Sequence, residues 1–357
     1  MIKYIGSKRK LVSLITSIIN EVPKINTVLD LFSGTSRVGH ALKRGNFAVI
    51  ANDHNTYAHT IATCYVQADL EKVEKNAKLI IKEFRSLPSI SGYFTETFCI
   101  NSKFFHPKNG ARIDAIREDI EKKCLEPELK SVVLVSLMEA ADRVDRTTGL
   151  QMAYLKKEVT RSDNDLELRF PDVLPIAKKG KGKAYQLEAQ KAVECLCADL
   201  AYIDPPYNSH SYLCNYHIWE TLVLWEKPEV YGIANKRVDC KERKSEFNSK
   251  KSFKNVFRKL LNSVQSKYLL VSFNNEGYIS KEELEEILKN IGNVVTFEVD
   301  YQRYIGSKIG IYNPGGVKTG KISHIKNKEY LFLCGKDVNS FDFNNIIKFD
   351  SKVKIVK

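Results

Sequence analysis

Short runs of consecutive apolar residues alternate with longer amphipathic segments along much of this chain. The runs cover residues 27–32, 47–51, 200–203 and 268–273, and each is followed directly by polar or turn-forming residues. Strands of a parallel sheet are buried on both faces, so they form continuous apolar runs of this length. Helices are predicted at 9–20, at about 36–44, at 217–225 and at 280–288, and a short helix or turn is predicted at 190–197. The alternation predicts a doubly wound α/β fold.

The end of the chain breaks this rhythm. Residues 293–301 and 329–334 are predicted to pair as antiparallel strands joined by a long loop, and residues 184–189 resemble one further strand. The helix at 280–288 has the best-defined start, because Ser280 and Glu283 have the spacing of a capping box. The long loop contains RYIGSK at 303–308, which nearly repeats KYIGSK at 3–8. Six residues are too few to indicate a domain repeat.

The middle of the chain is predicted to form an inserted, mainly helical subdomain. Helical patterns cover about 58–87, 112–123 and 131–144, and a Lys-Gly run at 178–183 closes the region. We interpret residues 61–185 as the insertion, and residues 1–60 with 186–357 as the domain that carries it. Its aromatic residues either form a small core or contact a duplex. The Lys-Gly run is expected to be a mobile linker that faces phosphates.

The charge balance indicates a polyanionic partner. The 357 residues include 56 Lys and Arg against 43 Asp and Glu, giving a net charge of +13 and a pI near 9.2. Nucleic acid is the first candidate for that partner, and an acidic membrane surface is the second. Residues 236–259 alone hold ten basic and three acidic side chains. This segment is therefore predicted to track phosphates.

Cysteine spacing and hydropathy argue against several other classes. The eight Cys are scattered without a CxxC pair, so we predict reduced thiols in a cytoplasmic protein and no metal site. The basic residues before residue 11 and the apolar run to residue 19 resemble a signal peptide. However, Ser and Thr interrupt that run, and no cleavage site follows it. No segment is long and apolar enough to predict a membrane span.

The tetrapeptide Asp204-Pro205-Pro206-Tyr207 follows the run at 200–203 and carries the most specific chemistry. Ligands of open α/β sheets bind at the carboxyl ends of strands, where this motif is predicted to lie. The lone pair of an aromatic amine is delocalised, and two hydrogen-bond acceptors could draw it out of the ring plane. Asp204 offers a carboxylate, Pro205 offers a carbonyl held by the stiff Pro-Pro pair, and Tyr207 could stack on a base. An ordinary strand stop with a capping Asp is the alternative.

Three other stretches form a candidate cofactor site. Ser33-Gly34-Thr35-Ser36-Arg37 lies between a predicted strand and helix, as a nucleotide-binding turn does, although it has neither GxGxxG nor a phosphate-loop motif. Asp53 ends the next strand at the spacing that suits ribose hydroxyls. Lys8 beside a helix start suits a carboxylate. Glu188 either contacts an adenine ring or is a plain surface residue.

Together these residues resemble the DNA adenine-N6 methyltransferases of the alpha motif order, relatives of the DNA adenine methylase. The resemblance rests on KYIGSK at 3–8, DLFSGTSRVG at 30–39, Asp53, and YIDPPYN at 202–208, in that order. It covers most of the predicted catalytic part and is weakest over residues 90–183. The chain departs from the commoner DPFxGxG turn at Thr35-Ser36-Arg37, and it has Glu188 where many relatives have Asp.

The resemblance implies a seven-stranded Rossmann-like sheet, S-adenosylmethionine as methyl donor, and a flipped adenine in double-stranded DNA as acceptor. The catalytic residues would be Asp204, Pro205, Pro206 and Tyr207. The cofactor positions would be Tyr4, Lys8, Asp30, Phe32, Ser33, Gly34, Asp53 and Glu188. The family also implies a modification enzyme with a possible cognate restriction endonuclease.

Two other functional classes stay open from the sequence. An enzyme that methylates an amine in RNA or protein would share the cofactor half of the site. A non-catalytic DNA-binding module would keep the basic surface without needing Asp204-Pro205-Pro206-Tyr207.

Overall fold

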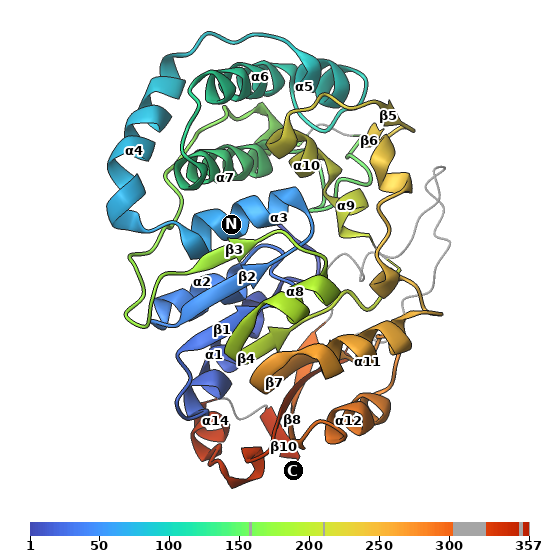
Figure 1. The fold of residues 1–357 in the computed structure, drawn as a ribbon. Helices are drawn as coiled ribbons and strands as arrows, with labels where there is room; N and C mark the ends of the chain where they lie inside the picture. Colours follow the sequence, from blue (N-terminus) through green and yellow to red (C-terminus); the bar gives the residue numbers. More distant parts are fainter. Residues whose placement is uncertain (157–158, 210, 303–325, 350–352, 357) are drawn as a thin grey trace.

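An eight-stranded sheet flanked by helices forms the centre of the molecule (Figure 1). The computed structural model describes residues 1–156, 159–209, 211–302, 326–349 and 353–356. The strands of this sheet are β1 (Thr27–Asp30), β2 (Ala48–Asn52), β3 (Lys183–Tyr185), β4 (Cys197–Ile203), β7 (Gln265–Asn274), β8 (Asn293–Gln302), β9 (Lys326–Gly335) and β10 (Val353–Val356). Their order is β10-β8-β9-β7-β4-β1-β2-β3. The predicted α/β class is confirmed.

Five neighbouring strands, β3, β2, β1, β4 and β7, run parallel to one another. From β1 the chain proceeds outward to β2 and β3, and then it returns to β4 on the other side of β1. The order of strands therefore reverses between β1 and β4, which is where open α/β sheets bind ligands. The fold alone points to this place as the site.

The other three strands are antiparallel to their neighbours. β9 pairs with β7 and with β8, so the predicted antiparallel pairing of the last long strands is confirmed. The prediction of seven strands is one short, because β10 adds an eighth beside β8. This edge strand has only four residues, and of these only Val353 is buried. So short an edge strand has too few inward positions to produce a recognisable pattern.

Helices cover both faces of the sheet because successive strand residues point to opposite sides. On one face, α1 (Val12–Glu21), α2 (Arg37–Arg44) and α14 (Asn344–Phe349) pack against Val28 and its neighbours. On the other face, α8 (Ala189–Cys195), α11 (Phe253–Ser263) and α12 (Lys281–Lys289) pack against Leu29. The capping box predicted at Ser280 and Glu283 begins α12. Gly45 ends α2, also as predicted.

A second core lies among helices beyond the β3 edge of the sheet (Figure 1). It is built by α3 (Thr56–Ala62), α4 (Leu70–Ser86), α5 (Tyr93–Thr95), α6 (Pro107–Lys122), α7 (Pro127–Val144) and α10 (His217–Leu224). Phe94, Phe98, Phe104 and Phe105 are at most 1% exposed, so these aromatics form core and do not face a duplex. Because α10 also belongs to this core, the helical part draws on residues outside 61–185. The domain boundaries proposed for the insertion stay a prediction.

The Lys-Gly run at 178–183 packs against the segments that precede β1 and β2. Lys179 donates to the carbonyl of Ile25 at 2.7 Å, and the backbone N–H of Lys179 donates to the carbonyl of Asn46. Lys181 forms an ion pair with Glu128 at 2.6 Å. Residues 25 and 46 precede β1 and β2, so the run lies at the amino ends of the strands, opposite the candidate motifs. Lys179 and Lys181 are thus held by contacts within the chain, which does not fit a mobile linker, and the phosphate-facing role of the run stays a prediction.

Candidate functional site

One pocket lies at the carboxyl ends of β1, β2 and β4. Asp30 pairs with Tyr202 across β1 and β4, and the N–H of Leu31 donates to the carbonyl of Tyr202 at 3.1 Å. This register brings the chain after both strands to the same edge of the sheet. The pocket is open to solvent, and the space between its walls, open solvent included, is about 830 Å³. Its walls include all eight predicted cofactor positions together with Asp204 and Pro206: Tyr4, Lys8, Asp30, Phe32, Ser33, Gly34, Asp53 and Glu188.

The glycine turn after β1 is held closely against β2. The N–H of Ser33 donates to the carbonyl of Asn52 at 2.9 Å. Gly34 has φ +49°, and a Cβ atom on it would lie 3.2 Å from the ring of Tyr4. Glycine is favoured there because it adopts positive φ without strain and leaves room for that ring. Ser36 also has φ +53° and precedes α2, so the turn has two left-handed positions without the GxGxxG pattern.

Asp53, which follows β2, orders both the glycine turn and its own turn. One carboxylate oxygen accepts the N–H of Gly34 at 3.0 Å, and the other accepts the N–H of Asn55 at 3.0 Å. The two turns that line the pocket are therefore joined through a single carboxylate. Asp53 also lines the pocket.

Asp30 lies at the end of β1 and is 1% exposed. Its carboxylate accepts the N–H of Gly39 in α2 at 3.1 Å. Burial raises the pKa of Asp30 to about 7; the bond from Gly39 opposes this rise, and the nearby carboxylates of Asp204 and Asp53 add to it. The carboxyl group is thus poised to change its protonation state near neutral pH.

Asp204 lies directly after β4 and contacts a buried lysine. The Nζ atom of Lys8 is 3.2 Å from the Asp204 carboxylate and 3.3 Å from the carboxylate of Glu329 on β9. Burial raises the pKa of Asp204 to about 6, with Lys8 lowering it and Glu329 raising it. Burial alone would lower the pKa of Lys8, but the two carboxylates and Tyr207 more than offset this, so the pKa is raised well above its ordinary value.

Tyr207 completes the motif and is fixed from two sides. Its hydroxyl accepts a hydrogen bond from the Asn274 side chain at 2.9 Å, and its ring packs edge-on against Phe273 at 5.1 Å. Pro206 lines the pocket, whereas Pro205 and Tyr207 lie beside it without forming its wall. All four residues follow the same strand end, so the structure brings the motif and the two turns together.

The N-terminal strap, which we define as residues 1–8, crosses from the helical core to the pocket. The Lys3 ammonium pairs with Asp145 at 2.7 Å, and the N–H of Ile5 donates to the hydroxyl of Tyr216. Tyr4 stacks between Tyr216, at 4.5 Å between ring centroids, and Tyr212, at 5.2 Å. These contacts place Tyr4 in the pocket wall and bring Lys8 within contact distance of Asp204.

One predicted residue and two missed residues show how much of the site could be found from the sequence. Glu188 begins α8 as its N-terminal flanking residue and is exposed at the pocket rim. Glu329 was missed because a single Glu at the start of an apolar strand is unremarkable. Phe247 was missed because it lies inside the basic segment; its ring packs edge-on against Phe32 at 5.3 Å. Only a three-dimensional arrangement could have identified the last two.

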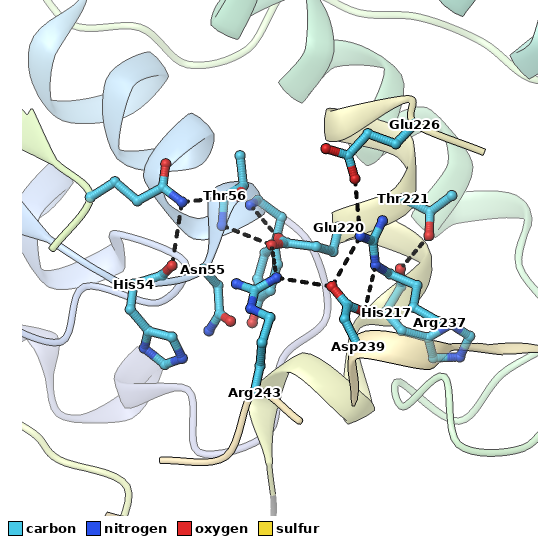
Figure 2. A network of polar contacts seen from close by, with 12 residues as sticks. His54, Asn55, Thr56, His217, Glu220, Thr221, Glu226, Arg237, Asp239 and Arg243 are labelled. Carbon is cyan, nitrogen blue, oxygen red and sulfur yellow. Dashed lines mark hydrogen bonds and ion pairs between the residues drawn. The ribbon is translucent and has the colours of Figure 1, made fainter. Parts of the chain in front are cut away.

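A polar network lies beside the pocket, on the helical side (Figure 2). Glu220 of α10 has a side chain that is 0% exposed, and it accepts the N–H groups of Thr56 and Tyr57 at the start of α3. Arg243 pairs with Glu220 at 2.9 Å and with Asp239 at 3.4 Å. The network thus connects the turn after Asp53 with the basic segment that contains Phe247.

Within the residues that the structure describes, no group of His, Cys, Asp and Glu is arranged to hold a metal ion. In the same part of the chain, no helix has the length and apolarity needed to cross a membrane.

The fold is of the Rossmann-like methyltransferase type. Its sheet is mostly parallel, and its pocket lies where the strand order reverses. The glycine turn, Asp53 and the Asp204 motif line this one pocket. A family model of the D12 class N6 adenine-specific DNA methyltransferases matches residues 4–287, and the chain belongs to this family. It is therefore an adenine-specific DNA methyltransferase by family, and the resemblance inferred from the sequence is confirmed.

Named relatives agree with this assignment. The type II methyltransferase M.NlaIII of Neisseria lactamica is 28% identical over 339 residues, which cover 92% of this chain and 99% of that protein. The type II methyltransferase M.FokI of Planomicrobium okeanokoites is 29% identical over 99% of this chain and 55% of its own length. The modification methylase StsI of Streptococcus sanguinis is 31% identical over 85% and 48%. The chain spans about half the length of these last two relatives.

Proposed function

We propose that this protein transfers a methyl group from S-adenosylmethionine to the N6 amine of an adenine turned out of duplex DNA, at one recognition sequence. The observation that carries the proposal is the shared cavity: Gly34, Asp53 and Asp204 border the same space. A donor held by the two turns would therefore lie next to an amine held by Asp204, which is the positioning that a transfer reaction needs.

The pocket has the polar groups that a nucleoside ligand requires. The hydroxyls of Ser7 and Ser33 are buried and have no hydrogen-bond partner among the described residues. Buried polar groups are normally paired, so these two indicate a ligand that supplies the partners. Asp53 and Glu188 offer acceptors for ribose hydroxyls and for the adenine amine, and Phe32 offers an apolar surface. When bound, S-adenosylmethionine would supply a methyl group activated by its sulfonium.

Tyr4, Lys8 and Asp30 complete the proposed cofactor wall, and Ser33 and Gly34 form the turn beneath it. Asp204 and the carbonyl of Pro205 would accept the two amine hydrogens and draw the lone pair toward the donor. Pro206 keeps that carbonyl in place, and Tyr207 would stack on the extruded base, worth about 1–3 kcal/mol. The proton released passes to Asp204 or to solvent.

The basic segment at 236–259 is the proposed DNA contact. Ser245 and Phe247 line the pocket, so this segment lies at its mouth. Lys241, Lys244, Lys250 and Lys251 are exposed on it. Cations in this place would neutralise phosphates beside the extruded base, and binding would weaken steeply as salt rises. Turning the base out would cost a few kcal/mol, which these contacts offset.

Replacing Asp204 tests the proposal. Asp204→Ala is expected to bind S-adenosylmethionine as the unchanged protein does and to lose methyl transfer by about 10²-fold or more, the cost of removing one preorganised polar group. Transfer is measured with a radioactive methyl donor and duplex DNA, and binding by calorimetry. Undiminished turnover in the variant would refute the role of Asp204.

A substrate panel separates the alternatives. Duplex DNA, single-stranded RNA and protein are offered to the same enzyme, and the methylated product is identified by mass spectrometry. N6-methyladenine in DNA alone supports the proposal, and methylated RNA or protein overturns it.

We further propose that the enzyme acts in the bacterial cytoplasm as the modification half of a restriction-modification system. Its relatives are named as type II methyltransferases and modification methylases. Sequencing the methylated bases in DNA from a host that expresses this chain would give the recognition sequence. Resistance of that DNA to a co-encoded endonuclease would identify the partner.

A further inference from the structure

Lys8 lies between two carboxylates that come from distant parts of the chain. Its Nζ atom is 3.2 Å from Asp204, which follows β4, and 3.3 Å from Glu329, which lies on β9. The three side chains are 8%, 19% and 10% exposed. By resemblance Lys8 was expected to face the cofactor, yet both of these contacts direct its ammonium toward the catalytic side of the pocket.

The charges in this cluster do not cancel. One ammonium faces two carboxylates in a place that water reaches poorly, and buried charges are costly unless they are paired. Lys8 favours the ionised form of Asp204, whereas Glu329 opposes it. Glu329 also favours the charged form of Lys8. Without Glu329, Lys8 would interact with Asp204 alone. It would then compete with a substrate amine for hydrogen bonds to the Asp204 carboxylate.

We propose that Lys8 and Glu329 are positioning residues for Asp204: Lys8 keeps the carboxylate ionised and aimed into the pocket, and Glu329 holds the ammonium to one side. This inference rests on the proposed function, in which Asp204 accepts a hydrogen bond from the target amine. Only the ionised carboxylate is a pure acceptor, since a protonated one also donates. Lys8 therefore sets the pH at which the site becomes competent, and Glu329 moderates its effect.

Among the ionisable groups around Asp204, Lys8 and Glu329 are the ones whose charge is expected to set its ionisation. Burial raises the pKa of Tyr202, Tyr207 and Tyr212, so these neighbours stay neutral in the working range. Asp30 also faces Asp204 and has a pKa of about 7, raised mainly by burial. Because Asp30 titrates in every variant, the effect of Lys8 and Glu329 is read from the displacement between pH profiles and not from one profile.

The test compares the pH dependence of kcat/KM, which reports groups of the free enzyme. Glu329→Gln removes a negative neighbour, so the acid limb should move to lower pH, and the ratio of kcat/KM at pH 5 to its plateau should rise about threefold. Lys8→Met removes the cation, so the limb should move to higher pH and the ratio should fall about threefold or more. Each unit of displacement corresponds to about tenfold on that limb.

Lys43 provides a matched control. It is buried and pairs with Asp69 at 3.1 Å, but it lies outside the pocket. Lys43→Met should lower thermal stability, as any loss of a buried pair does, and leave the pH profile in place. A merely structural role for Lys8 would give the same result for Lys8→Met. Equal profiles for wild type, Lys8→Met and Glu329→Gln overturn the inference.

A second readout needs no activity. Thermal unfolding of the cofactor-free protein at pH 8 is measured for Lys8→Met, Asp204→Asn and the double variant. The effects should be non-additive, because the lysine matters less once the carboxylate is gone. Additive effects overturn the inference even if wild type methylates DNA. If wild type transfers no methyl to adenine at any pH, the proposed function fails, and this cycle still decides whether Lys8 and Asp204 are coupled.

Discussion

The charge cluster in the pocket and the polar network beside it are balanced in opposite ways. In the pocket, Lys8 serves both Asp204 and Glu329, and the pKa of Asp204 is raised to about 6, chiefly by burial. In the neighbouring network, Arg237 and Arg243 share Asp239, and there the guanidinium bonds overcome burial and lower the pKa of Asp239. The surroundings of Asp204 disfavour its ionised form, whereas the surroundings of Asp239 favour its ionised form.

The difference distinguishes a carboxylate that can bind a ligand from carboxylates that hold parts of the structure together. A group that is strained electrostatically at neutral pH gains by meeting a ligand, which is why raised carboxyl pKa values gather at reactive sites. A group that is already satisfied has nothing to offer a ligand but can fix two elements together. Asp204 faces the pocket, whereas Glu220 and Asp239 tie α3, α10 and the segment after β6 (Lys236–Arg237) to one another (Figure 2).

Glu220→Ala should give the largest loss of stability. Its carboxylate accepts two backbone N–H groups of α3 and pairs with Arg243, and the side chain has no exposure to water. Removing one partner of a buried ion pair costs about 3–5 kcal/mol, because the remaining groups stay buried and unpaired. Urea denaturation at pH 7 measures the change.

Glu226→Ala is the matched control within the same network. Its side chain is 59% exposed and lies 3.3 Å from Arg237. Water can replace it, so the expected loss is about 0.5 kcal/mol. Equal losses in the two variants would mean that burial does not distinguish the members of the network.

Asp30→Asn should stabilise the protein at pH 8 by roughly 2 kcal/mol, the direction opposite to that expected of the network. Burial raises the pKa of Asp30 to about 7, so folding works against its charge once both states are ionised. That penalty is full above about pH 7 and disappears as pH falls toward the unfolded value near 4. The gain should accordingly shrink to near zero at pH 4, as followed by thermal unfolding of the cofactor-free protein.

Asp239→Asn sharpens the same experiment. Its pKa is lowered, mainly because the bonds from Arg237 overcome the effect of burial. Its stabilising contribution is therefore present above the unfolded pKa and is lost as pH falls through the folded one. This variant should lose stability at pH 8 and resemble wild type at low pH. A loss for both aspartates at pH 8 would remove the contrast between the clusters.

The sequence predicted the parts of the site that depend on local pattern. Continuous apolar runs located β1, β2, β4 and β7, and the residues that follow three of them identified Gly34, Asp53 and Asp204. Parallel strands place their carboxyl ends on one edge, so these residues could be expected to meet. Lys8 was found from its place in KYIGSK, although its ion pairs with Asp204 and Glu329 were not.

What the sequence could not give depends on contacts between distant segments. Glu329 is 125 positions after Asp204 by residue number, and nothing about a Glu in the first half of a strand reveals a lysine partner. The run at 178–183 shows the same limit: its charges suggested a phosphate contact, yet Lys181 is paired with Glu128 within the chain. Charge alone does not say whether a partner lies inside or outside the chain. The echo at 303–308 lies outside the described residues.

Arg237→Lys should have the smallest effect and tests whether geometry or charge holds the network. Arg237 donates from Nε and Nη2 to the two oxygens of Asp239, at 3.0 and 3.1 Å. A lysine keeps the charge but cannot form this paired arrangement, because its ammonium is a single point donor. The expected loss is about 1 kcal/mol by urea denaturation, with methyl transfer preserved. Arg237→Met, which also removes the charge, should lose more. If lysine equals arginine, then charge alone explains why the pKa of Asp239 is low, and the fixed fork of the guanidinium is not what separates this network from the pocket.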